Sequence, residues 1–283
     1  MKMKMKRKIY RGAGVFAVLA GLLMTQGSGT VQATNQINGI SGVTEINLTA
    51  KVDHISTADG GSMLLWGYAD DDNNQFFGTR AQYPGPTLIV DQGDTLTINL
   101  RNGLSVKAGA VPNVSIVFPG HEVTATCFNV ADPAVIIVCP EVNTGTLTME
   151  ADTNIGVSYS FTATNAGTYM YHSGTNPGLQ VEMGLTGALI VRPSNFDPNA
   201  PENEFLAYSH PDTKYGHEEL FFLSEMDPRI HKEVEFNGPD TPYLQELLDN
   251  YVSNYWFING RTAPDNFSAA YVNWLPTQPY NSV

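Results

Sequence analysis

The sequence has little positive charge, and this shortage excludes some classes of partner. Only 15 of its 283 residues are Lys or Arg, against 28 Asp or Glu, and six of those basic residues lie within residues 1–33. The remaining chain has nine basic and 28 acidic residues, a formal net charge of −19. That balance argues against nucleic acid or an anionic lipid surface as a partner.

Cysteine is almost absent, which limits the thiol chemistry open to the chain. The two cysteines are Cys127 and Cys139. In an oxidising compartment this pair favours a structural disulfide that closes the loop between them. The alternative is a metal-binding thiolate, although neither cysteine is followed closely by the His or Met of a blue-copper loop. Zinc-ligand spacings, a glycine-rich phosphate loop and a nucleophile elbow are also missing.

Long apolar runs are absent outside the first 33 residues. Residues 1–33 combine a basic start, an apolar stretch at 14–24 and a small-residue cleavage site ending at Ala33, which together predict a signal peptide. The apolar stretch is short for a bilayer span, and an uncleaved membrane anchor is the alternative. We therefore expect a periplasmic or secreted protein without membrane contact after cleavage.

Alternation of apolar and polar residues dominates the next part of the chain. Ile46, Leu48 and Ala50 alternate with polar neighbours, which is typical of half-buried strands. About eight such segments, separated by turn residues, predict an all-β fold, a Greek-key β-sandwich over residues 34–193. The apolar run at 134–138 is expected to lie in its core.

A proline-rich stretch at 192–203 interrupts this pattern and predicts a linker. Beyond it, residues 219–224 and 255–261 predict strands. Residues 241–251 predict a helix that has Thr241 as its N-cap. Residues 194–283 are therefore expected to form a linker and a mixed C-terminal extension. An isolated strand edge is not stable, so this part should pack on the sandwich or need a partner.

Two stretches contain more specific motifs. Gly-Thr-Tyr-Met-Tyr-His-Ser at 167–173 leads, through a loop too irregular for a helix, to Gly-Leu-Thr-Gly-Ala-Leu-Ile-Val at 184–191. Pro-Gly-Pro-Thr-Leu-Ile-Val at 84–90 is followed closely by Gly-Asp. Both stretches resemble the first cupredoxin (plastocyanin-like) domain of multicopper oxidases. Residues 255–261 resemble the opening of the second domain of those enzymes, which we expect to be incomplete here.

The resemblance implies a cupredoxin-like fold, copper as the cofactor and a copper-dependent oxidoreductase activity. In active relatives this domain directs four histidines at a trinuclear copper cluster, and His172 matches one of those positions. The other three positions hold Val117, Pro119 and Gly174. Ser173 stands where a type 1 copper site would need its cysteine, and a hydroxyl does not replace a thiolate. We therefore expect this chain not to be catalytic alone.

Three functions remain open at this point. The first is a scaffold or binding module of multicopper-oxidase type. The second is a copper-binding protein that uses His172 together with His121, for which a solvated loop histidine is the alternative. The third is an oxidase subunit that is completed in a homo-oligomer or by a partner cupredoxin domain.

Overall fold

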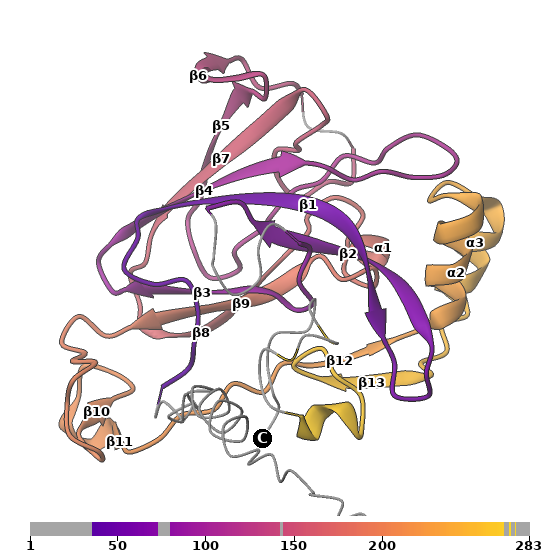
Figure 1. Ribbon diagram of the computed structural model, residues 1–283. Helices are drawn as coiled ribbons and strands as arrows, with labels where there is room; N and C mark the ends of the chain where they lie inside the picture. The colour runs from indigo at the N-terminus through magenta and orange to yellow at the C-terminus, as the bar shows by residue number, and fades with distance from the viewer. Residues whose placement is uncertain (1–35, 73–79, 142–143, 269–271, 273–274, 276–283) are drawn as a thin grey trace, which may run out of the picture. The chain divides into compact units, whose positions relative to one another are not determined.

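The computed structural model describes residues 36–72, 80–141, 144–268, 272 and 275, and the statements below concern these residues. A six-stranded sheet has the order β2-β1-β4-β7-β5-β6, and a three-stranded sheet has the order β3-β9-β8 (Figure 1). The strands of the larger sheet are β1 Glu45–Ser56, β2 Ser62–Asp70, β4 Thr95–Asn102, β5 Thr124–Asn129, β6 Asp132–Ile137 and β7 Ile155–Thr162. Those of the smaller sheet are β3 Gly85–Asp91, β8 Gly167–His172 and β9 Thr186–Arg192.

The core lies between these sheets and contains the apolar residues that alternate along their strands. Leu48 and Ile98 of the larger sheet and Leu88, Tyr171 and Leu189 of the smaller one are all fully buried in one cluster. Burial of each such aliphatic side chain stabilises the fold by roughly 1.5–3 kcal/mol. The predicted all-β, Greek-key, cupredoxin-like sandwich is confirmed.

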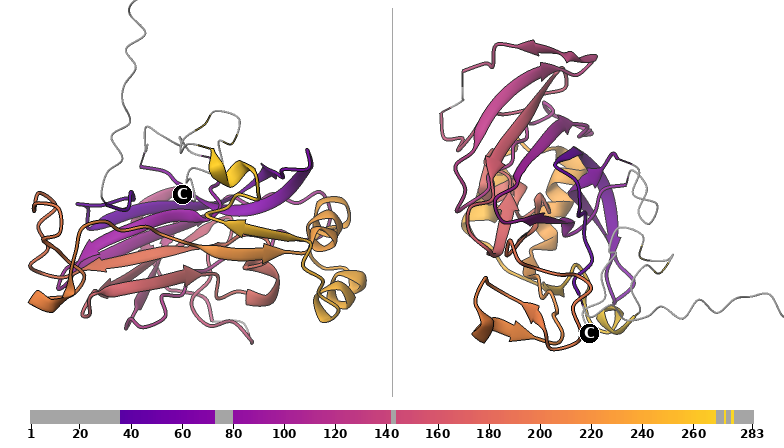
Figure 2. Two further views of the ribbon diagram at one scale, coloured as in Figure 1. Left: turned by 90° about the horizontal axis from the view of Figure 1, so that it is seen from below. Right: turned by 90° about the vertical axis from the view of Figure 1, so that its left-hand side faces the viewer.

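The C-terminal part packs against the sandwich. It contains short two-stranded ribbons (β10 Phe205–Leu206 with β11 Lys214–Tyr215, and β12 Leu223–Met226 with β13 Tyr255–Ile258) and the helices α2 Pro228–Asn237 and α3 Pro242–Asp249. Figures 1 and 2 place α2 and α3 at one end of the sheets and β10 and β11 at the other. Ile230 and Val234 of α2 reach the main core. None of the described helices is long and apolar enough to cross a membrane.

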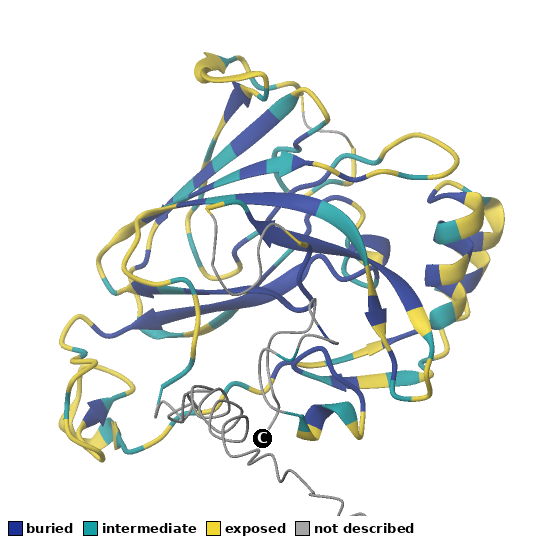
Figure 3. Ribbon diagram, in the orientation of Figure 1, coloured by how far each residue is buried: buried dark blue, intermediate teal, exposed yellow. Residues whose placement is uncertain are grey.

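Local signals predicted some of these elements well and others poorly. The expected helix at 241–251 is α3, and the Thr241 hydroxyl caps it by accepting from the Leu244 amide. The strand expected at 219–224 lies slightly later, as β12. The run at 134–138 is not core, because β6 is the last strand of its sheet and little covers it (Figure 3). Val138 is 93% exposed.

A buried ion pair joins the C-terminal part to the sandwich. Arg192, at the end of β9, makes a two-pronged contact with Glu218, whose carboxylate also accepts from the Ile37 amide at 2.8 Å and the Tyr215 hydroxyl at 2.9 Å. The Arg192 side chain is 7% exposed and that of Glu218 is 15% exposed. Burial tends to raise the pKa of Glu218, but Arg192 and the other donors outweigh it and lower that pKa.

We predict that Glu218→Gln lowers the free energy of unfolding by roughly 3 kcal/mol at neutral pH, because Arg192 is left buried without a counter-charge. The folded-state pKa of Glu218 lies below 4.5. The stabilisation from its ion pair with Arg192 therefore persists above that pH and is lost as the pH falls through the folded-state pKa. Urea denaturation of both proteins at neutral and acidic pH measures this. The matched control is Glu204→Gln, which removes an exposed pair with Lys214 and should cost at most about 1 kcal/mol. An equal cost for both variants would contradict the prediction.

Candidate functional site

The loop after β8 is held by buried hydrogen bonds of its own. The Ser173 hydroxyl, fully buried, donates to Oε1 of Gln180 at 2.6 Å and accepts from the Thr175 amide at 3.1 Å. Gln180 then donates through Nε2 to the Asn113 carbonyl at 2.8 Å. Gln180 ends α1 Pro177–Gln180, so the loop expected to lack helix contains one short turn of it. These contacts tie the loop to the segment 113–118.

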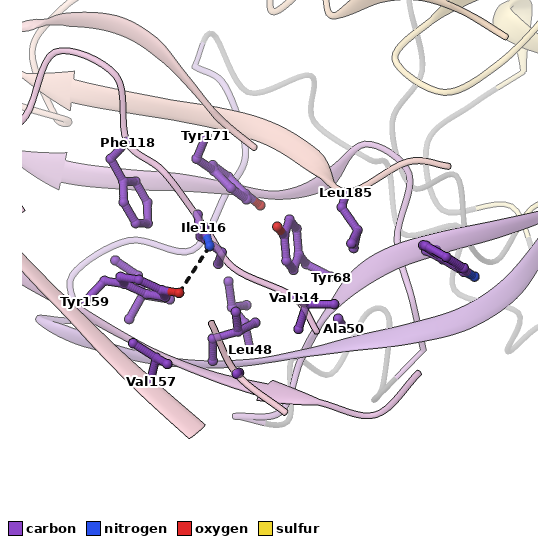
Figure 4. Packing of buried hydrophobic residues seen from close by; sticks show 14 of the residues in the cluster. Leu48, Ala50, Tyr68, Val114, Ile116, Phe118, Val157, Tyr159, Tyr171 and Leu185 are labelled. Atoms are coloured by element: carbon purple, nitrogen blue, oxygen red, sulfur yellow. Dashed lines mark hydrogen bonds between the residues drawn. The ribbon is translucent and has the colours of Figure 1, made fainter. Parts of the chain in front are cut away.

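Buried tyrosines hold that segment from within the sandwich (Figure 4). The Tyr68 hydroxyl donates to the Ser115 carbonyl at 2.8 Å. The Tyr159 hydroxyl accepts from the Ile116 amide at 3.3 Å and donates to the Met149 carbonyl at 2.6 Å. Burial raises the pKa of both phenols far above neutral pH, so both hydroxyls remain donors. The backbone of 113–118 is thereby positioned against β8.

Segment 113–118 and the β8 loop meet closely at Gly174. Val117 and His172 exchange two backbone hydrogen bonds of 2.8 and 3.2 Å, and the Gly174 amide donates to Oγ of Ser115 at 3.0 Å. A Cβ atom on Gly174 would lie 2.8 Å from Cγ1 of Val117, and 3.2 Å from both Oγ of Ser115 and Cγ2 of Thr148. The space beside Gly174 is therefore filled by neighbouring side chains.

His172 and His121 occupy different environments. Nδ1 of His172 lies 2.9 Å from the Ser173 carbonyl and donates to it, so in a neutral ring Nε2 would be the acceptor. The His121 ring lies between Phe161 and Tyr169, with centroid distances of 4.6 Å to each. Burial lowers the pKa of His121, although the neighbouring backbone carbonyls partly oppose that shift. Its imidazole is therefore neutral at pH 7.

Both histidines line the same surface cavity, of about 360 Å³. The rest of its wall is mainly apolar and includes Val117, Leu147 and Thr148. The structure thus brings the two predicted metal residues to one hollow. In the described part of the chain, no three His, Cys, Asp or Glu side chains are grouped closely enough to hold a metal ion. Cys127 and Cys139 form a disulfide elsewhere, between β5 and the residue two positions after β6.

Comparisons with known proteins agree on one family. A family model described as "Multicopper oxidase" matches residues 144–195. A "Probable nitrite reductase-hydroxylamine oxidoreductase fusion protein" of Kuenenia stuttgartiensis is 31% identical over 192 residues, which cover 66% of this chain and 20% of that protein. An L-ascorbate oxidase of Cucurbita maxima is 31% identical over 130 residues, covering 46% of this chain and 19% of that enzyme.

This chain resembles the multicopper oxidase family, to which these matches point. It spans about a fifth of the length of the two curated relatives named above. A solved multicopper oxidase, mgLAC, is 20% identical to this chain, and the match covers 78% of this chain and 54% of mgLAC, with a TM-score of 0.46.

Copper is the cofactor that the multicopper oxidase family implies, and the residues present do not fit a copper cluster. Of the positions that the resemblance assigns to ligands, His172 alone offers a donor. Val117 and Pro119 have no side-chain donor, and Gly174 has no room for one. Ser173, at the position of a type 1 cysteine, is engaged with Gln180. The sequence alone did not indicate the role of Gln180, because Asn113, to which Gln180 donates a hydrogen bond, is 67 positions away.

We predict that Gly174→Ala lowers the free energy of unfolding by about 1–3 kcal/mol, because the added methyl meets Val117 and Thr148. Chemical denaturation measures this. Gly178→Ala is the matched control, since a Cβ there meets nothing within 4 Å and should be neutral or stabilising by up to about 1 kcal/mol. Adding Val117→Ala to Gly174→Ala should restore part of the loss, as expected for residues in contact. A Gly174→Ala variant that is as stable as the Gly178→Ala variant would contradict the prediction and show that the space beside Gly174 is open.

Proposed function

We propose that this chain is a cupredoxin-fold scaffold or binding module of multicopper-oxidase ancestry, not catalytic by itself. The observation that carries the proposal is that the surface at Gly174 (the closed face) has no free space. Val117, Ser115 and Thr148 occupy the space beside this position, which the resemblance assigns to a copper ligand. Members of the family bind copper. Copper is held by sites that combine soft thiolate and imidazole ligands, and the single imidazole of His172 does not make up such a site.

An exported location is part of the same proposal. The signal-peptide features of residues 1–33 support it, and so does the bond between Cys127 and Cys139, since structural disulfides persist in oxidising compartments. The periplasm and the extracellular medium both satisfy these features. The acidic balance of the chain outside residues 1–33 suits a protein that stays in solution there.

A second candidate function is copper binding in an arrangement unlike that of the family. The observation that favours it is the shared cavity of His172 and His121, each of which has a neutral form suited to a metal. Two imidazoles in a hollow of about 360 Å³ could bind one cupric ion together with water.

Copper loading separates these two functions. The full chain is incubated with cupric ion, dialysed and measured by elemental analysis beside His172→Ala and His121→Ala. For a scaffold we expect no retained copper, no oxidation of phenols or ferrous ion, and no difference between the three proteins. Stoichiometric copper that is lost in both variants would overturn the scaffold proposal and support the second candidate. His210→Ala, which removes an exposed histidine between β10 and β11, controls for loss of surface binding.

A further inference from the structure

His231 of α2 is almost completely buried between the C-terminal helices and the sandwich. Its side chain is 1% exposed, and α2 lies beside the end of β2 (Figure 1). Nδ1 of His231 lies 2.5 Å from the carbonyl oxygen of Leu64 in β2. Nε2 lies 3.4 Å from Oε1 of Glu182, whose side chain is 8% exposed. Both ring nitrogens of this buried histidine therefore face oxygen acceptors.

Acceptors on both sides decide which form of the imidazole fits the site. A neutral imidazole donates from one nitrogen and keeps a lone pair on the other. In either neutral tautomer, that lone pair would face the Leu64 carbonyl or the Glu182 carboxylate. Among the described residues, Nε2 has no hydrogen-bond partner that would relieve this contact. The imidazolium ion has a donor on each nitrogen and a charge opposite to that of Glu182, so the geometry favours the protonated ring.

The surrounding charged groups leave Glu182 to His231. No Lys or Arg of the described chain forms an ion pair with Glu182. The nearby charged side chains pair with one another instead: Asp227 with Arg229 at 2.6 Å, and Glu235 with Lys107 at 3.4 Å and with His54 at 3.8 Å. Tyr251 faces Glu182 from the chain beyond α3. Burial and then the charge of Glu182 raise the pKa of Tyr251, so its hydroxyl remains a neutral donor. The α3 residues in the core beside α2 are apolar, Leu244 and Leu247.

Glu182 also joins separate parts of the chain. Its Oε1 accepts from the amide of Asp227, the N-cap of α2, at 2.6 Å. Its Oε2 accepts from the Tyr251 hydroxyl at 3.1 Å. Glu182 follows Gln180, which holds the β8 loop, by two positions. The contact with His231 therefore connects α2 both to β2 and to the end of the β8 loop.

We propose that His231 and Glu182 form a pH-sensitive attachment of α2 to the sandwich, tight when the imidazole is protonated and weakened when it loses that proton. Histidine is the side chain that usually changes its charge between about pH 5 and pH 8. Folding gives the protonated ring two acceptors and a counter-charge, so this stabilisation is present at acidic pH and is lost as the pH rises. The sign is opposite to that of the Glu218 ion pair, which is lost as the pH falls.

Urea denaturation of the full chain at about pH 5 and about pH 8 tests the attachment. At the lower pH, His231→Gln should raise the equilibrium constant for unfolding by about tenfold or more, because Glu182 loses its buried counter-charge. At the higher pH the increase should be several-fold smaller, because the wild-type ring is then neutral as well. The matched control is His217→Gln, which removes an exposed histidine beside Glu219 and should change that constant by less than about fivefold at either pH. An effect of His231→Gln that is equal at both pH values, or larger at the higher one, would overturn the proposal.

Nitrogen-15 NMR of the histidine rings in the wild-type chain measures the protonation of His231 without relying on how a variant folds. We expect both ring nitrogens of His231 to carry protons at about pH 5, and one of these protons to be lost by about pH 8. Glu182→Gln removes the negative charge and keeps a carbonyl oxygen for the Asp227 amide, so His231 should then lose its proton at a lower pH. A neutral ring at about pH 5, or a titration that Glu182→Gln leaves unchanged, would contradict the proposal. Neither residue lines the His172 cavity, so the result is independent of the copper measurements.

Discussion

The fold around His172 depends on a buried hydrogen-bond network that joins the β8 loop to the segment 113–118. Ser173, Gln180 and Ser115 are each almost fully buried, and each has its partners inside the protein. A buried polar network stabilises and specifies a structure only when its members are satisfied. Here these hydrogen bonds connect the β8 loop with the segment 113–118.

The closed face follows from that link. The Gly174 amide donates to Ser115, which draws the loop toward Val117 and Thr148 until a Cβ atom no longer fits. His172 is the one histidine left at the positions that the resemblance assigns to copper ligands, and it lines an apolar cavity together with His121. The resemblance to multicopper oxidases therefore concerns the sandwich of this chain, while the residues at the ligand positions differ from those of a copper cluster.

Much of the fold was predictable because its signals are local. Alternation of apolar residues identified strands such as β1, and the Thr241 cap identified α3. The network was not predictable, since Gln180 meets Asn113 across 67 positions and no periodicity reports that contact. The run at 134–138 was misjudged for a related reason. An apolar sequence indicates burial, but here β6 stands at a sheet edge, where no other described strand covers it.

Side chains of the protein itself close the face beside Gly174, and we propose that this face does not accept copper. Diffraction from crystals soaked in cupric ion, with anomalous data collected at the copper edge, tests it most directly. We expect no anomalous peak within bonding distance of Nε2 of His172, and we expect Val117 to remain packed against Gly174. A copper peak bonded to His172, with Val117 and Thr148 displaced from Gly174, would contradict it.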